Sequence, residues 1–98
     1  MAGNVKETDN SIFVGDKPFM NYVTGIVMQF TTHNQETVVV KARGKYISRA
    51  VDVSEMALKR FLEGKIKIQD IQIDSEEVTN RQGEQVRVSS IEITLQRV

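Results

Sequence analysis

One short stretch of the sequence concentrates side chains that bind anions. Residues 41–50 read KARGKYISRA and contain no acid, although the 98-residue chain balances 13 Lys and Arg against 13 Asp and Glu. The cations are Lys41, Arg43, Lys45 and Arg49, and the neutral donors are Tyr46 and Ser48. Basic side chains and helix N-termini are the usual partners of phosphate oxygens. The stretch therefore indicates a phosphate-binding surface, and the alternative interpretation is an ordinary solvated charged face.

The sequence offers no comparable set of residues for catalysis or metal binding. His33 is the only histidine, cysteine is absent, and the adjacent Glu76 and Glu77 would point to opposite faces of a strand. Gly15 and Gly44 stand outside any glycine-rich nucleotide-binding motif. We therefore predict a protein that is not an enzyme and uses no cofactor or metal, with His33 complementing the C-terminus of a helix.

Composition predicts one small folded domain inside the cell. Hydrophobic residues make up 40% of the chain and charged residues 27%, as in ordinary globular proteins. No apolar run approaches the roughly 20 residues of a membrane span, and the polar start MAGNVKETDN lacks the apolar core of a signal peptide. We expect a flexible tail over residues 1–10, a single domain over residues 11–98, and no membrane partner.

Hydrophobic periodicity predicts the order β-α-β-α-β-β. Strands are expected at residues 12–14, 36–42, 65–73 and 86–96, and helices at residues 18–34 and 46–62. The second strand should be buried on both faces. Asp16 or Lys17 should cap the first helix, and Asn34 should end it. The predicted fold is an α/β two-layer sandwich, in which both helices cover one face of a four-stranded mixed sheet.

The last two strands share an irregularity. Their apolar alternation slips by one residue, after Ile68 in the first and after Val88 in the second. Such a slip requires a bulge or moves the apolar residues to the other face. Between these strands lies a polar segment, so we predict a long hairpin whose tip, near residues 80–84, projects from the domain.

This arrangement brings the candidate phosphate-binding residues to one edge of the sheet. The first two strands would run parallel, so the turn VGDKP after the first strand lies at the same edge as KARG after the second. Lys17 would then join Arg43, Lys45 and Arg49. A neutral net charge argues against a strong nonspecific binder.

The second helix carries two apolar stripes. One consists of Ile47, Val51, Leu58 and Leu62, and the other of Ala50, Val53, Ala57 and Phe61. Because a helix of a small domain has one core to face, the extra stripe indicates contact with another protomer. The alternative is a single broad band that faces the core.

Four segments resemble the Alba family, the small chromatin proteins of archaea: VGDKPFMNYV, VVVKARGKYISRAVD, MALKRFL and SSIEITLQR. The resemblance covers roughly residues 11–97. It implies a fold similar to the C-terminal domain of bacterial translation initiation factor three, with a long hairpin arm. It also implies a homodimer that coats double-stranded DNA without strong sequence preference, often binds RNA, and stays with the chromosome in the cytoplasm.

The resemblance also assigns roles to individual residues. Lys17 matches a loop lysine that contacts DNA, and Arg43 matches the arginine of the Lys-Ala-Arg-Gly turn. In the family a lysine of the first turn is reversibly acetylated, and Lys17 is the only candidate here. Lys41, Lys45 and Arg49 lie near that turn in the sequence, and Arg81 and Arg87 would lie on the arm. Phe61 falls where the family uses an aromatic residue to join one dimer to the next.

Two features depart from the family pattern. Asp16 stands where several relatives have a second lysine, and residues 74–88 contain four acids against two arginines. Two alternatives to DNA binding follow. One is an RNA chaperone or ribonucleoprotein subunit, although Tyr22 and Tyr46 are too few to form a base-stacking platform. The other is a protein-assembly module that no longer binds nucleic acid.

Overall fold

The structure, a computed structural model, describes residues 10–98. Of the tail predicted over residues 1–10, only Asn10 falls within this range, and the rest lies outside the described residues. The side-chain amide of Asn10 donates to the Thr37 carbonyl oxygen at 2.7 Å, and the Val39 amide donates to the Asn10 carbonyl oxygen at 3.0 Å. Asn10 is therefore joined to the second strand of the sheet.

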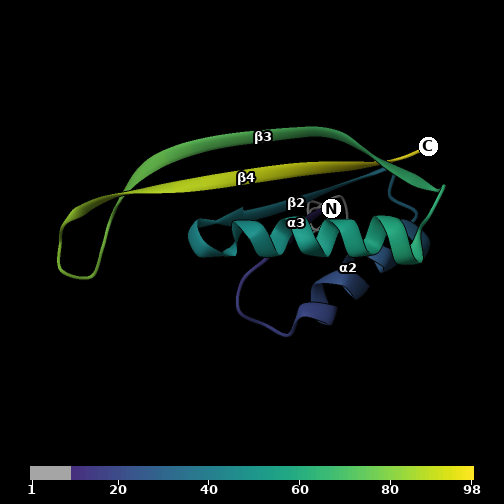
Figure 1. The fold of residues 1–98 in the computed structure, drawn as a ribbon, viewed down its shortest axis with the longest axis horizontal. Coiled ribbons are helices and arrows are strands. Elements are labelled where there is room, and N and C mark those ends of the chain that lie inside the picture. The colour runs from purple at the N-terminus through teal and green to yellow at the C-terminus, as the bar shows by residue number, and fades with distance from the viewer. Residues whose placement is uncertain (1–9) are drawn as a thin grey trace, which may run out of the picture.

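The predicted element order and the mixed four-stranded sheet are confirmed (Figure 1). The chain forms β1 (Ser11–Phe13), α2 (Phe19–Thr31), β2 (Thr37–Arg43), the 3-10 turn η1 (Gly44–Tyr46), α3 (Ile47–Met56), the π-helical segment η2 (Ala57–Phe61), β3 (Ile66–Thr79) and β4 (Gln85–Arg97). The strand order is β1-β2-β4-β3, in which β1 and β2 are parallel and the other two pairs are antiparallel. Neither helix within residues 10–98 has the length and apolarity needed to cross a membrane.

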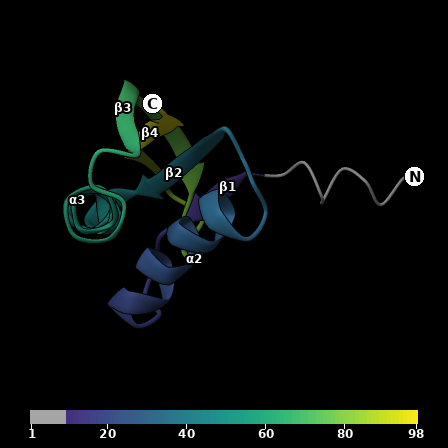
Figure 2. The same cartoon turned by 90° about the vertical axis from the view of Figure 1, so that its right-hand side faces the viewer.

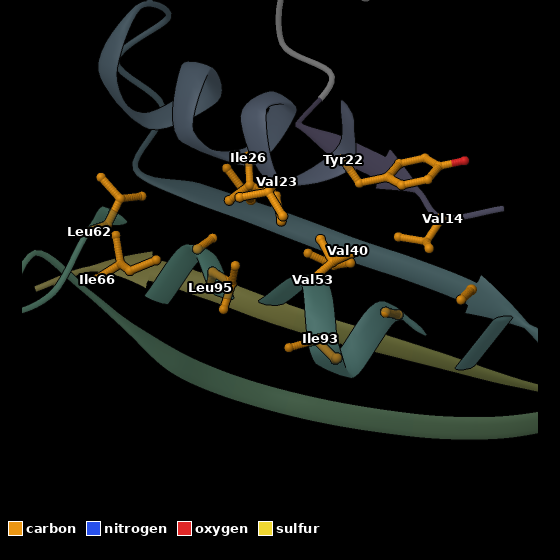
Figure 3. Close-up of a cluster of buried hydrophobic side chains, with 14 of the residues drawn as sticks. Val14, Tyr22, Val23, Ile26, Val40, Val53, Leu62, Ile66, Ile93 and Leu95 are labelled. Atoms are coloured by element: carbon orange, nitrogen blue, oxygen red, sulfur yellow. The ribbon is translucent and has the colours of Figure 1, made fainter. Parts of the chain in front are cut away.

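Both helices cover the same face of the sheet, as predicted, and the hydrophobic core lies beneath them (Figures 2 and 3). In β2, Val38, Val40 and Ala42 are buried, and their β4 partners Leu95, Ile93 and Ile91 are buried too. The residues between them are only partly buried. The prediction that β2 is buried on both faces is therefore wrong. The helices cover one face, and we call the other the open face of the sheet.

The ends of α2 differ from the prediction. Pro18 is the N-cap residue with an extended ψ of 140°, and no side chain caps the helix, so the prediction of an Asp16 or Lys17 cap is wrong. Proline fits this place because the first amides of a helix have no partner within it. The C-cap is Thr32, two residues before the predicted Asn34. Asn34 has a left-handed φ of 52° and turns the chain toward β2.

The π-helical segment η2 interrupts the regular spacing on which the two apolar stripes of the second helix were assigned. The Leu62 amide donates to the Ala57 carbonyl oxygen, five residues earlier, which inserts one extra residue into this turn. Leu62 therefore occupies the core position that regular helical spacing assigned to Phe61. Phe61 is displaced outward and is 50% exposed, and Val51 is 41% exposed. The exposed residues therefore come from both predicted stripes, while Ile47 and Leu58 still pack against the core.

The two long strands extend beyond the rest of the sheet (Figure 1). β2 pairs with β4 only between Ser90 and Gln96, so residues 75–89 form a two-stranded projection, here called the arm. The predicted irregularity takes both of its possible forms. In β3 a bulge lies between Ile68 and Asp70. Within its described pairing β4 has no bulge, so Val86 and Val88 face the opposite side from Ile91.

Candidate nucleic-acid interface

The ends of β1 and β2 lie side by side at one edge of the sheet, as predicted. Phe13 is level with Lys41 in the parallel pair, and the Val14 amide donates to the Lys41 carbonyl oxygen at 2.9 Å. The segments that follow, residues 15–18 and 43–46, therefore leave the sheet at the same edge. We call Lys17, Arg43, Lys45 and Arg49 the basic edge. Their binding roles remain predictions, and the structure supplies their placement.

A hydrogen-bond network joins the two turns that carry the basic edge. Arg49 reaches from α3 to the first turn, where its Nη1 donates to the Gly15 carbonyl oxygen at 2.6 Å. The Tyr22 hydroxyl oxygen accepts from the amides of Gly15 and Lys17, each at 3.0 Å. The Arg49 guanidinium carbon also lies 5.8 Å from the centre of the Tyr22 ring. The turn that carries Lys17 is thus joined to α2 through Tyr22 and to α3 through Arg49.

The second turn depends on the backbone of Gly44. Its φ is +57°, a left-handed conformation that strains residues with a side chain, so a glycine fits this position. Arg43 before it is extended and exposed, and Lys45 after it is exposed, with its ammonium 5.5 Å from the Tyr46 ring centre. Arg43 Nη1 lies 3.9 Å from Glu76 at the base of the arm. An exposed pair at this distance contributes about 0–1 kcal/mol, so a phosphate can displace it.

Arg49 and Lys41 occupy different surroundings from Lys45. The Arg49 side chain is partly buried, yet the bond to Gly15 uses only one of the five N–H donors of its guanidinium. Lys41 lies on the open face of the sheet, away from the helices, because its neighbours Val40 and Ala42 point into the core. Its ammonium is 3.9 Å from Glu92 and 5.4 Å from the Phe13 ring centre. Lys41 therefore lies on the open face and is not part of the basic edge, whereas Lys45 lies at the start of the helical segment.

The arm presents its arginines among acids. Arg87 donates to Glu77 at 3.2 Å and to the Ser75 hydroxyl at 3.2 Å, so its charge is largely matched within the arm. Arg81 is exposed at the tip, which the Asn80 side chain closes by accepting from the amides of Gln82 and Glu84. The structure thus places both predicted arginines on the arm, but in a region with a surplus of acids.

The other residues singled out in the sequence lie on the surface. Asp16 is exposed next to Lys17, Phe61 is exposed on the outer side of the second helix, and His33 is exposed just past the end of α2. Within residues 10–98 no group of three or more His, Cys, Asp and Glu side chains is placed to hold a metal ion.

Two residues near the basic edge were not recognised in the sequence. From the sequence alone Tyr22 is only a candidate for base stacking, whereas in the structure its hydroxyl organises the first turn. Phe13 belongs to a short apolar strand in the sequence pattern, whereas it is 68% exposed on the open face. The alternation of Ile12, Phe13 and Val14 already indicated that Phe13 points away from its neighbours. Whether other elements cover that side of the strand depends on the arrangement of the sheet and helices, which the alternation does not reveal.

Comparison with known proteins identifies the family. The model of the Alba family matches residues 10–75. The chain is 47% identical over 87 residues to the "DNA/RNA-binding protein Alba" of Methanococcus maripaludis, which covers 89% of this chain and 97% of that protein. It is 54% identical over 85 residues to the protein of the same name from Nanoarchaeum equitans, covering 86% of this chain and 93% of that one.

A solved structure supports the same assignment. The fold is similar to Alba from Thermoplasma volcanium, with a TM-score of 0.82 and 48% identity, covering 90% of this chain and all of the other. Sequence identity and fold agree over nearly the whole domain, and the family match includes the turns that carry the basic edge. The chain belongs to the Alba family.

Proposed function

We propose that this protein binds nucleic acid, chiefly double-stranded DNA, through phosphate contacts and without strong sequence preference. Three observations support the proposal. Relatives about half identical to the chain are named as DNA/RNA-binding proteins. The basic edge collects four cations from two turns and a helix start. The contact from Arg49 to Gly15 fixes the first turn to α3, the helix that follows the second turn, and this contact is the observation on which the proposal chiefly depends.

The protein acts as a homodimer in this proposal, because an apolar surface extends beyond the core. Ile71 and Ile73 of β3 lie directly opposite the core residues Ile93 and Ile91 of β4, so they share the face that the helices cover. They are nevertheless 53% and 79% exposed. A hollow of about 420 Å³, lined by Ile47 and Ile73 together with Asp74 and three serines, lies between Ile73 and α3, which also exposes Val51. Such a surface on a small domain fits a second copy.

The dimer would double the basic edge and align two copies along one duplex. Coating of DNA by many dimers would compact it, and Phe61 is available to join neighbouring dimers, because it is exposed on the outer side of the second helix. Acetylation of Lys17 would remove one charge per protomer from the basic edge and weaken binding. These features describe a chromatin protein of an archaeal cell, associated with the chromosome in the cytoplasm.

The dependence of duplex binding on salt tests the proposal. If each protomer makes about four phosphate contacts, a plot of log affinity against log salt should have a slope of roughly −7. Replacing Ile73 with Glu should produce monomers by native mass measurement and reduce this slope by about half. Binding that is equally strong at low and moderate salt would contradict the proposal. Strong oligomers that ignore DNA would favour the protein-assembly alternative.

RNA binding is the second candidate, because the relatives' names include it and phosphates are common to both polymers. Competition of duplex DNA, duplex RNA and single-stranded RNA for one labelled duplex DNA ranks these ligands. Duplex DNA should compete best if chromatin binding is the main function. A clear advantage of RNA in this assay would favour the alternative.

A further inference from the structure

Phe13 presents an aromatic ring on the open face of the sheet. Its neighbours Ile12 and Val14 pack toward the helices, so the ring of Phe13 projects the other way and is 68% exposed. It lies level with Lys41 on β2, whose ammonium is 5.4 Å from the ring centre. An exposed phenylalanine on a strand with a basic neighbour is the kind of surface on which nucleic-acid bases stack.

The ring forms one wall of a hollow that reaches the basic edge. This hollow has a volume of about 400 Å³, and Gly15, Arg43 and Tyr46 also line it. Arg43 therefore belongs both to the hollow and to the basic edge. A nucleic-acid strand whose phosphates lie on the basic edge would pass the mouth of the hollow, close enough for an adjacent base to enter.

The charges of the hollow favour a base over a phosphate. Its lining contains two cations and two carboxylates, which form the pairs Lys41–Glu92 and Arg43–Glu76, both at 3.9 Å. The lining is thus neutral overall and suits a flat, uncharged group with hydrogen-bonding edges. Carboxylates accept from the exocyclic amino groups of bases, and lysine and arginine donate to base carbonyls. A phosphate group would meet repulsion from Glu76 and Glu92.

We propose that this hollow binds an unpaired nucleobase, which stacks on Phe13 while its flanking phosphates lie on the basic edge. The ligand class is a single-stranded segment of nucleic acid, since bases in a duplex are already stacked and paired. This inference rests on the proposed function and adds a second binding mode to it. The base must displace the Lys41 ammonium from the face of the Phe13 ring. An exposed cation–π contact contributes about 0.5–1 kcal/mol, and stacking of a base on an aromatic side chain about 1–3 kcal/mol.

The experiment compares the wild-type protein with Phe13→Ala and Phe13→Trp. Binding of a labelled single-stranded adenine oligonucleotide and of a labelled duplex DNA is measured by fluorescence anisotropy at the same salt concentration. Phe13→Ala should weaken single-strand binding by at least about fivefold and leave duplex binding within about twofold. Phe13→Trp should retain single-strand binding, because tryptophan also stacks. Exposure of the ring makes these substitutions compatible with folding, and circular dichroism checks this.

Phe13→Trp also supplies a direct reporter, because the chain contains no tryptophan. Single strands should quench its fluorescence, whereas duplex DNA should leave it nearly unchanged. Met28→Trp, at an exposed position on α2, is the matched control and should respond to neither ligand.

The possible results separate the base site from the proposed function. A wild-type protein that binds both ligands, with Phe13→Ala unchanged toward the single strand, overturns the base site alone. Equal quenching of Phe13→Trp by duplex and single strand also overturns the base site. So does a wild-type protein that binds the duplex but not the single strand. A wild-type protein that binds neither ligand overturns both the proposed function and the inference that depends on it.

Discussion

The basic edge and the arm both present arginines, but their electrostatic surroundings differ. At the edge, Arg43 and Lys45 project from an acid-free stretch of sequence, and the pair of Arg43 with Glu76 measures 3.9 Å. On the arm, Arg87 is 3.2 Å from Glu77 and lies in a segment with more acids than arginines. A carboxylate at hydrogen-bond distance offsets much of a cation's attraction for phosphate. On this comparison the position of basic residues relative to acids, and not their number, decides where we propose that this neutral protein binds DNA.

Removing two cations from the basic edge should have the largest effect. We expect Lys17→Ala/Arg43→Ala to weaken duplex binding by about tenfold or more at 0.1 M salt, because each lost phosphate contact also loses its counterion release. The loss should be similar for all duplex sequences, since phosphate contacts do not read bases. Fluorescence anisotropy with several unrelated duplexes measures it.

The matched control removes two cations from the opposite end of the sheet. Lys67 pairs with Gln96, whereas Arg43 pairs with Ser90 at the other end of the contact between β2 and β4. Lys65→Ala/Lys67→Ala should therefore change affinity much less than the double substitution at the edge. Equal losses in the two variants would mean that total charge, not the basic edge, determines binding.

Loosening the first turn should have the next largest effect. Tyr22→Phe removes the hydroxyl that accepts from the Gly15 and Lys17 amides. Leaving such donors without an acceptor should reduce the free energy of unfolding by about 1–3 kcal/mol, and duplex binding should weaken because Lys17 is no longer held. Urea denaturation and anisotropy measure the two effects. Tyr46→Phe, which removes the other tyrosine hydroxyl, should leave the free energy of unfolding nearly unchanged, and an equal loss of stability there would contradict the proposed anchoring.

Neutralising the acids of the arm should strengthen binding moderately. Glu76→Gln/Glu77→Gln releases Arg43 and Arg87 from their carboxylate partners. Because an exposed ion pair contributes up to about 1 kcal/mol, and only Arg43 of the two arginines belongs to the basic edge, we expect affinity for duplex DNA to rise by up to about fivefold. Glu36→Gln/Glu63→Gln is the control with the same charge change elsewhere on the surface. If it raised affinity equally, the change in net charge would explain the gain.

Removing the arginines of the arm should have the smallest effect. Arg81→Ala/Arg87→Ala takes away one exposed cation and one that Glu77 already matches. We expect duplex affinity to fall by about twofold or less, measured by anisotropy under the conditions used for the edge variants. A loss as large as that of Lys17→Ala/Arg43→Ala would show that the arm grips DNA despite its acids.

Periodicity predicted most of the fold because it reports which residues face a core. The strand and helix order, the slip after Ile68 and the meeting of the first two turns all follow from local patterns and are present in the structure. The prediction that β2 is buried on both faces was wrong, because a run of Val residues does not reveal whether one face of a strand or both faces are covered. The separation of Phe61 from Ala57 was missed because a π-helical turn breaks the spacing on which the two stripes were assigned.

The candidate site was only partly predictable for a similar reason. Residue types placed cations at one edge, but hydrogen bonds and ion pairs between distant residues decide which of them are available. The bond between Arg49 and Gly15 spans 34 positions in the sequence, and the pair of Arg43 with Glu76 connects the edge with the arm. The exposure of Phe13 likewise could not be predicted from the sequence, because it depends on both helices packing against the other face of the sheet.

The most direct test of the account is the salt dependence of duplex binding by three proteins measured side by side. The log–log slope should be roughly −7 for the wild type, fall to about half for Lys17→Ala/Arg43→Ala, and stay near the wild-type value for Arg81→Ala/Arg87→Ala. A slope that is unchanged by the edge substitutions but reduced by the arm substitutions would contradict the central claim that the basic edge holds the DNA.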